Sequence, residues 1–127
     1  MFDAFLDDAT LNDATLNNSK LINAKMRRAK CKVAKFISAD LSKADLSDSD
    51  FSGATLDSAN LSKATLSGVN FTEANLVETD LSGAKLDKAN LSGANLSQAI
   101  VSEDKLKLAI LDENTTLPSG DKFTGWD

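Results

Sequence analysis

Few residues in this 127-residue chain could perform acid–base or nucleophilic chemistry. The chain contains no histidine and no tyrosine, and its single cysteine is Cys31. Histidine is the commonest general base and the commonest metal ligand in proteins. The sequence shows no nucleophile–base pair, no phosphate-binding glycine loop and no cluster of metal ligands. It therefore predicts a protein that is not an enzyme, with no catalytic residues, no cofactor and no metal.

The charged residues are distributed unevenly along the chain. Residues 1–13 carry four acids and no base, whereas residues 40–127 carry fifteen acids and seven bases. The segment between them carries bases only, namely Lys20, Lys25, Arg27, Arg28, Lys30, Lys32 and Lys35. Such a segment can form a belt that binds anions or nucleic acid, or its charges can be paired with acids elsewhere in the fold. The elements that position these side chains decide between the two interpretations.

Those elements follow from a five-residue period. Every fifth residue from Leu6 to Val101 is apolar, and a small residue stands two positions before almost every one of them. A step of five turns an α-helix by about 140°, so the apolar residues would not form a stripe. On a flat strand an odd step moves the side chain to the opposite face. The pattern therefore predicts a backbone that bends once per unit, as in a solenoid.

The repeated units also resemble a known family. Read as A-(D/N/T/K)-L-S-(G/K), units such as ADLSK (39–43), ANLSK (59–63) and ANLSG (89–93) are similar to the consensus of the pentapeptide-repeat family, in its cyanobacterial or bacterial type. The resemblance covers roughly residues 4–103. It implies an all-β fold, a right-handed quadrilateral parallel β-helix with four units per coil. We expect about five coils in residues 1–103 and a C-terminal cap of a short helix, a strand and a tail in residues 104–127.

Twenty residues per coil place each inward residue directly over another, at a spacing of about 4.8 Å. One inward ladder then contains Cys31, Phe51 and Phe71, and the next contains Phe36. We expect Phe51 to stack on Phe71 and Cys31 to be a small core residue beneath Phe51. The glycines at 53, 68, 83 and 93 all fall at the corner position, where they serve the turn.

The same spacing brings the basic segment next to acids. Lys20 is expected to face Asp40, and Lys25 and Lys30 to face Asp45 and Asp50. Arg27 should lie beside Asp7, and Arg28 between Asp8 and Asp48. Such surface pairs contribute only about 0.2–1 kcal/mol each, but they cancel most of the charge of the belt. Binding to nucleic acid is therefore not expected.

Two lysines of the segment have no acidic neighbour one coil away. These are Lys32 and Lys35, and Ile37 and Val77 are expected on the outside of the same part of the solenoid. Basic and exposed β-branched side chains together favour contact with a protein. We therefore predict that Lys32, Lys35, Ile37 and Val77 form a surface for a protein partner of unknown identity.

The two ends of the repeat are predicted to differ. At the start, Met1 is in the inward register and Phe2, Phe5 and Leu6 follow without a visible cap. Residues 1–5 could fold over the first coil, a second chain could cover it in a homodimer, or the chain could be excised from a longer protein.

At the other end, we expect a short helix with Ser102 as N-cap and with Leu106, Ala109 and Ile110 closing the last coil. In residues 115–120 we expect a strand with Leu117 inward and a turn at Pro118–Gly120, and we expect Phe123 and Trp126 to pack on this cap.

Composition limits the location and the function. The sequence has no apolar run long enough to span a membrane, and MFDAFLDD does not look like a secretory signal. We therefore expect a cytoplasmic protein, or a lumenal or periplasmic one if a targeting segment has been removed. The leading hypothesis is a rigid, non-catalytic binding or scaffold module for protein–protein interaction. The resemblance implies two alternatives: a DNA mimic that binds a topoisomerase such as DNA gyrase, and an accessory factor in stress or photosynthesis.

Overall fold

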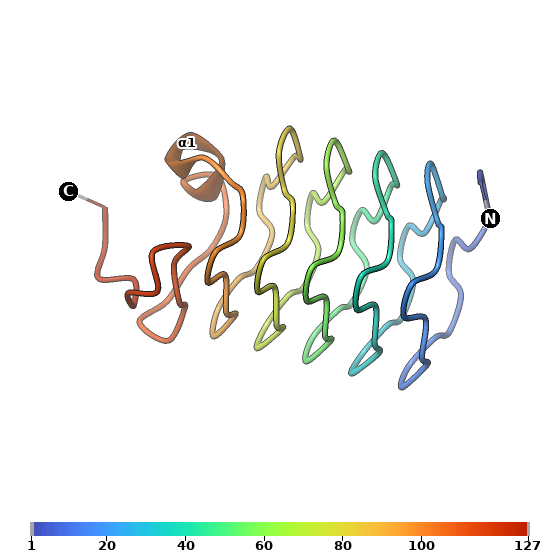
Figure 1. Ribbon diagram of the computed structural model, residues 1–127, viewed down its shortest axis with the longest axis horizontal. Coiled ribbons are helices and arrows are strands. Elements are labelled where there is room, and N and C mark those ends of the chain that lie inside the picture. Colours follow the sequence, from blue (N-terminus) through green and yellow to red (C-terminus); the bar gives the residue numbers. More distant parts are fainter. Residues whose placement is uncertain (1, 127) are drawn as a thin grey trace.

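The computed structural model describes residues 2–126, which form a rod with the N-terminus at one end and the C-terminus at the other (Figure 1). The chain winds around the rod, and parallel bridges join residues that are twenty positions apart, such as Phe5 with Lys25 and Thr10 with Lys30. Each coil therefore contains four five-residue units, one on each of four faces. The predicted quadrilateral parallel β-helix is the observed architecture.

The four faces are defined by the residues at the centre of each bridge. Face I carries Phe5, Lys25, Asp45, Thr65 and Lys85; face II carries Thr10, Lys30, Asp50, Asn70, Asn90 and Ile110; face III carries Thr15, Lys35, Thr55, Asn75, Asn95 and Thr116; face IV carries Lys20, Asp40, Asn60, Asp80 and Ile100. Faces II and III thus extend one coil further than faces I and IV.

Each corner of the coil is a tight turn. In the first coil, for example, the Ala9 amide donates to the Leu6 carbonyl at 3.0 Å, and Asp8 has a φ of 62°. This combination is that of a type II turn, whose third residue is left-handed. The glycines at 53, 68, 83 and 93 occupy this position, with φ between 65° and 70°. Most other corners place a residue with a side chain there, including the β-branched Val33 at 59°.

Polar residues on the faces hold the turns in place. The Asp40 carboxylate accepts hydrogen bonds from both the backbone amide and the hydroxyl of Ser42, and the Asn60 side chain accepts the same two from Ser62. Asp and Asn side chains favour this local bond to the amide two residues further on. The D/N-L-S order of the repeat is therefore a turn-forming signal as well as part of the strand.

The centre of the rod is filled by the inward large and small residues. Cys31, Phe36, Phe51 and Phe71 are all 0% exposed. The ring centroids of Phe51 and Phe71 lie 5.8 Å apart, and those of Phe36 and Phe51 lie 5.3 Å apart. Ser49 and Thr79 are buried polar residues at small inward positions, and their hydroxyls donate to the carbonyls of Leu46 and Leu56.

The first coil is open at the N-terminal end. The Asp3 backbone amide donates to the Ile22 carbonyl and Phe5 pairs with Lys25, so residues 2–5 continue the coil and do not fold over it. Met1 lies outside the described residues. Phe2 and Phe5 are 64% and 81% exposed, and Leu6, Leu11 and Leu16 are only partly buried.

The C-terminal end is covered. Helix α1 (Glu103–Leu106) begins after Ser102, whose hydroxyl accepts from the Lys105 amide at 3.3 Å. The helix takes the place at which face I would continue, and its last residue, Leu106, is buried. The expected N-cap is therefore confirmed.

The repeat register resumes after the helix. Ile110 pairs with Asn90 on face II and is 51% exposed, so the prediction that Ile110 helps to close the last coil was wrong. Ile110 is exposed because it takes the outward strand position, while Ala109 and Leu111 on either side of it pack against the core.

The last part of the described chain covers the C-terminal end of face III. Thr116 pairs with Asn95 in parallel and with Lys122 in antiparallel orientation, after a turn in which the Gly120 amide donates to the Leu117 carbonyl. Leu117 packs against the core, and the expected strand and turn are confirmed. The rings of Phe123 and Trp126 meet edge to face at 4.9 Å. That residues 104–127 form a unit separate from 1–103 stays a prediction.

Candidate binding surfaces

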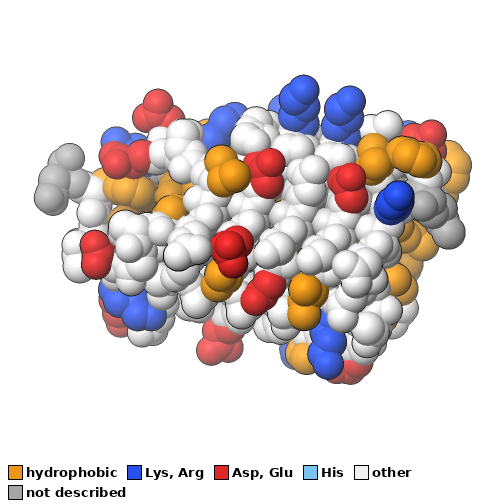
Figure 2. Space-filling model, in the orientation of Figure 1, with side chains coloured by type: hydrophobic (Ala, Val, Ile, Leu, Met, Phe, Trp, Pro, Cys, Tyr) orange, Lys and Arg blue, Asp and Glu red, His pale blue; other side chains and the backbone are white. Residues whose placement is uncertain are grey.

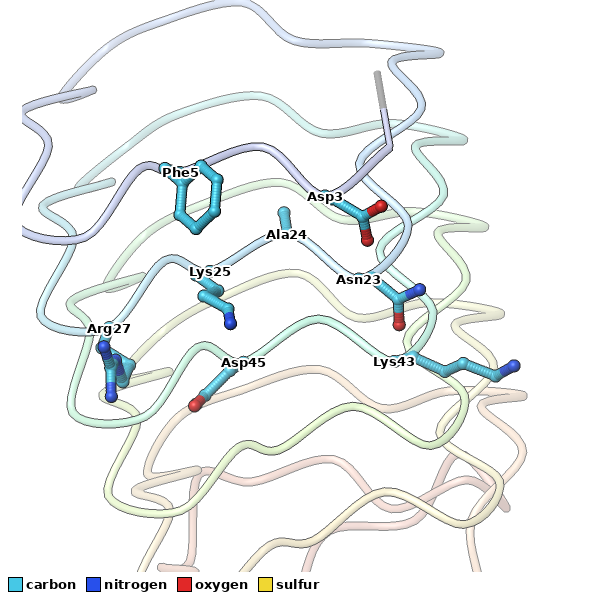
Figure 3. A pocket seen from close by; sticks show the side chains of 8 residues that line it. All are labelled: Asp3, Phe5, Asn23, Ala24, Lys25, Arg27, Lys43 and Asp45. Carbon is cyan, nitrogen blue, oxygen red and sulfur yellow. The ribbon is translucent and has the colours of Figure 1, made fainter.

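A groove with a volume of about 560 Å³ lies on face I near the N-terminal end of the rod. Figure 3 shows that three successive coils build it. Phe5, Lys25 and Asp45 of face I form its middle. Asp3, Asn23 and Lys43 lie at the corner before face I and form one rim, and Arg27 lies at the corner after face I. The groove is lined by Asp3, Phe5, Asn23, Ala24, Lys25, Arg27, Lys43 and Asp45.

The side chains in the groove combine an aromatic ring with both signs of charge. The Lys25 ammonium lies 5.7 Å from the centroid of the Phe5 ring, a cation–π distance. Asp45, one coil further on, accepts hydrogen bonds from the amide and the hydroxyl of Ser47. Lys43 extends away from the groove floor on the rim (Figure 3). The groove can therefore offer an apolar contact, a cation and an anion within one short stretch.

Arg27 and Arg28 are held by two carboxylates of the first coil. Arg27 donates to Asp7 through its backbone amide at 2.9 Å and through its guanidinium at 2.7 Å. Arg28 makes two bonds to the Asp8 carboxylate, at 2.8 and 3.0 Å. Hydrogen bonds from the two guanidinium groups lower the pKa of the Asp7 and Asp8 carboxyls from the usual 3.8. Both arginine pairs expected from the sequence are present.

The lysine pairs follow the expected register but not the expected contacts. Lys20, Lys25 and Lys30 are bridged to Asp40, Asp45 and Asp50, respectively. Among the described residues, however, the ion pairs are those of Arg27, Arg28 and Lys107, so Lys25 and Lys30 do not touch the acids of the next coil. The reason is that Asp45 and Asp50 turn along the chain toward Ser47 and Ser52.

The predicted partner surface is divided between two corners of face III. Lys35 lies at the centre of face III, and Ile37 and Val77 stand two coils apart along one of its corners, with Asp57 between them. Lys32 lies at the opposite corner, beside Val33, which is 49% exposed. The four residues are therefore on one side of the rod, but they do not form a continuous apolar patch. Whether they bind a partner stays a prediction.

Features that would support catalysis are not found in the part of the chain that the structure describes. The single thiol, Cys31, is fully buried, and burial raises its pKa to about 12, which removes the thiolate that reactive cysteines require. Residues 2–126 hold no group of three or more side chains that could bind a metal. The one helix described is far too short and too polar to cross a membrane.

The rest of the surface is mixed. On the side seen in Figure 2, most of the rod is covered by the backbone and by side chains that are neither charged nor hydrophobic, acids and bases are scattered among them, and hydrophobic side chains gather toward the ends. The sequence predicts a partner surface on face III, which stays a prediction, and the face I groove was not predicted. The signal that could have found the groove was the twenty-residue spacing of Phe5, Lys25 and Asp45, which places an aromatic ring, a cation and an anion in one ladder.

Comparison with known proteins identifies the repeat. The sequence matches the family described as Pentapeptide repeats over residues 3–32, 34–72 and 64–102. No curated protein matches the chain.

Three solved structures illustrate the similarity. A pentapeptide repeat protein from the Arabidopsis thaliana thylakoid lumen is 26% identical over 92% of this chain and 82% of its own, with a TM-score of 0.74. The protein Rfr23 from the cyanobacterium Cyanothece 51142 is 26% identical over 91% of this chain and 89% of its own, with a TM-score of 0.66. QnrB1, a plasmid-mediated fluoroquinolone resistance protein, is 24% identical over 98% of this chain and 80% of its own, with a TM-score of 0.54, and shows the shared fold alone.

The expected fold class, a right-handed quadrilateral β-helix, is confirmed by these structures. The matched segments cover most of the chain and coincide with the coils that build the four faces. The chain belongs to the pentapeptide-repeat family.

Proposed function

We propose that the chain is a rigid, non-catalytic binding module and that the face I groove receives a segment of a protein partner. The observation that carries this proposal is the groove itself, which places Phe5, Lys25 and Asp45 on successive coils beside a volume of about 560 Å³. An aromatic ring next to opposite charges suits a polypeptide that carries both charges and an apolar side chain. A nucleic acid, with one sign of charge, would meet Asp3 and Asp45.

Rigidity supports the same role. The floor of the groove is a ladder in which Lys25 is bonded to the first coil, through Ala4 and Leu6, and Met26 is bonded to Asp45 of the third. The backbone of such a floor loses little freedom when a partner binds, and this lowers the entropic cost of recognition. The surface of Lys32, Lys35, Ile37 and Val77 is the second candidate for a partner.

DNA mimicry, with a topoisomerase such as DNA gyrase as the target, is the weaker alternative. Lys25, Lys30, Lys32 and Lys35 are exposed on the second coil and interrupt any continuous negative surface. The likeness to QnrB1 is one of fold. A DNA gyrase supercoiling assay with and without a fluoroquinolone separates the two functions, because a binding module for another protein neither inhibits the enzyme nor protects it.

The test of the groove uses charge reversal. We expect a Lys25→Glu/Lys43→Glu variant to lose the proteins that the immobilised wild-type chain captures from an extract of the source organism, and to bind the purified partner at least ten-fold more weakly by calorimetry. The matched control is Lys85→Glu/Lys88→Glu, which makes the same charge change at the far end of the rod. Lys32→Glu/Lys35→Glu tests the face III surface. If the groove variant binds as the wild type does, the groove is not the binding site.

A further inference from the structure

The N-terminal end of the rod exposes unpaired strand edges. In the second coil, the Lys25 amide donates to the Ala4 carbonyl at 2.8 Å and its carbonyl accepts from the Leu6 amide at 2.7 Å. The equivalent groups of Phe5, Thr10 and Thr15 point away from the rod, and within residues 2–126 they make no backbone hydrogen bond. Edges of this kind are templates for pairing with another chain.

The same end also exposes part of the apolar core. Leu11 and Leu16 are partly exposed, whereas the residues one coil below them, Cys31 and Phe36, are 0% exposed. Phe2 and Phe5 extend the apolar area to the rim, and hydrophobic side chains gather at this end in Figure 2. A partner that covers this end would bury the apolar side chains and would also supply hydrogen-bond partners for the backbone groups of the strand edges.

We infer that this end binds a second copy of the chain, end to end about a two-fold axis. A single added strand could pair with one face only and would leave the axis of the rod exposed. A partner that covers the end needs strand edges on the sides of a square of the same width. A second copy has that shape by construction, and a two-fold axis brings the same patch of both copies together.

The pitch of the helix selects one position for this axis. With a rise of about 4.8 Å per coil, the end is a ramp that descends by about 1.2 Å from each face to the next. Two such ramps fit along their whole length only if the high side of one meets the low side of the other. Face I then lies against face IV of the second copy, and face II lies against face III.

In this arrangement the opposing residues are complementary. Thr10 lies opposite Thr15 of the second copy in an antiparallel, hydrogen-bonded pair, a favourable cross-strand combination. At the axis, the large Leu11 and Leu16 meet the small Ala14 and Ala9 of the second copy.

The corners fit equally well. Asp7 and Asp8 lie opposite Asn18 and Asn17, and Asn12 lies opposite Asp13, so no carboxylate faces another carboxylate. Every one of these pairs follows from a single axis.

The opposite end of the rod offers no such partner. Helix α1 and the antiparallel pair of Thr116 with Lys122 cover it, so a head-to-tail chain of copies is disfavoured. One end is a small part of the 6330 Å² surface. The interface therefore falls at the low end of the size of specific complexes, about 1,200 Å² in total, and we expect a dimer that dissociates on dilution.

The register is tested by disulfide formation between two variants. Opposite Cα atoms in a hydrogen-bonded antiparallel pair are about 5.5 Å apart, which is within the range that a disulfide spans. We expect Thr10→Cys mixed with Thr15→Cys to give the cross-linked heterodimer under mild oxidation, whereas each variant alone stays uncross-linked. Thr10→Cys mixed with Thr55→Cys is the control, since Thr55 lies two coils below Thr15 on the same face. Native Cys31 is buried and does not compete.

Sedimentation equilibrium of the 127-residue chain supplies the second measurement. We expect a monomer–dimer equilibrium that Leu11→Asp weakens at least ten-fold, with an unchanged circular dichroism spectrum because Leu11 is at the open end. A chain that stays monomeric at millimolar concentration and forms no mixed disulfide would overturn the inference. Self-cross-linking of Thr10→Cys alone would also overturn it, because that result requires a different axis.

Discussion

At the scale of single residues, position within a ladder decides what a side chain can tolerate. Leu61 is 0% exposed and lies between Leu41 and Leu81, which are also buried. A side chain there has no path to water in either direction along the rod. The leucine in the first coil, Leu11, is partly exposed, so a polar side chain at that position can reach water.

Replacing Leu61 by aspartate should prevent folding or destabilise the chain by more than about 4 kcal/mol, because an unpaired carboxylate would be buried in the core. Urea unfolding followed by far-ultraviolet circular dichroism measures the effect. Leu61→Met is the control and should cost less than about 1.5 kcal/mol, since it keeps the volume and the apolar character. An aspartate variant that unfolds at the same urea concentration as the wild type would contradict the packed core.

The arginine pairs predict a dependence on pH. Asp7 and Asp8 have lowered pKa values in the folded chain because Arg27 and Arg28 donate hydrogen bonds to their carboxylates. Their contribution to stability is therefore present above the ordinary pKa of 3.8 and is lost as the pH falls through the lower folded-state values. Both pairs are exposed, so the effect is small and is reduced by salt.

We expect the melting temperature at low salt to fall as the pH drops below about 4, and to fall less in Asp7→Asn/Asp8→Asn. Thermal unfolding across this pH range compares the two chains. Equal pH dependence in the wild type and the double variant would show that the pairs do not contribute to stability.

At the scale of the structural element, the corner turn is the repeated unit that limits the sequence. Its left-handed position is adopted by Asp, Asn, Ser, Lys, Glu, Arg and Gln at most corners and by glycine at others. Val33 is the exception, because a β-branched side chain is strongly disfavoured at positive φ. Here the strain is stored on the surface, since Val33 is 49% exposed.

Val33→Asn should therefore raise the free energy of unfolding by about 1 kcal/mol, because asparagine tolerates the left-handed region. Ile37→Asn is the matched control: it also removes an exposed β-branched residue, but at a corner position without positive φ. Thermal and urea unfolding report the difference. If both variants change stability equally, the gain comes from lost apolar exposure and not from relief of backbone strain.

At the scale of the whole molecule, the rod is a stack in which each coil contacts the coils directly before and after it. The parallel bridges join residues one coil apart throughout the described chain, with one extra residue accommodated between Asn95 and Thr116. Stability is then close to a sum of coil and interface terms. The two ends differ because one carries α1 and the other carries an open edge.

Deleting one complete coil, residues 55–74, should give a folded β-helix with a lower melting temperature. The deletion joins Ala54 to Asn75 and keeps every later residue on its own face and in its own ladder. Circular dichroism and thermal unfolding test this outcome. Deleting residues 55–72 instead should abolish folding, because the later inward residues would then point to water. Equal stability of the two deletions would argue against the ladder register.

The sequence by itself determined the assignment of residues to core, corner and face. The cause is geometric, because a five-residue bend repeated in one register sends Phe51 and Phe71 inward and Lys25 outward wherever the coil lies. The arginine pairs followed from the same spacing, since Asp7 and Asp8 lie one coil from Arg27 and Arg28. The period also gave the short helix and its N-cap, because Asp104 cannot occupy a small inward site.

Only the tertiary structure decided what depends on side-chain reach and on where the stack is interrupted. Asp45 accepts a hydrogen bond from Ser47, and the Lys25 ammonium lies over the Phe5 ring, so the two side chains do not pair with each other. These contacts determine the shape of the face I groove. Ile110 faces outward because the chain regains its register after α1, which no local pattern specifies. The open edge at Phe5, Thr10 and Thr15 likewise exists only once the coils are stacked, since an edge is a property of the assembled helix and not of any unit in it.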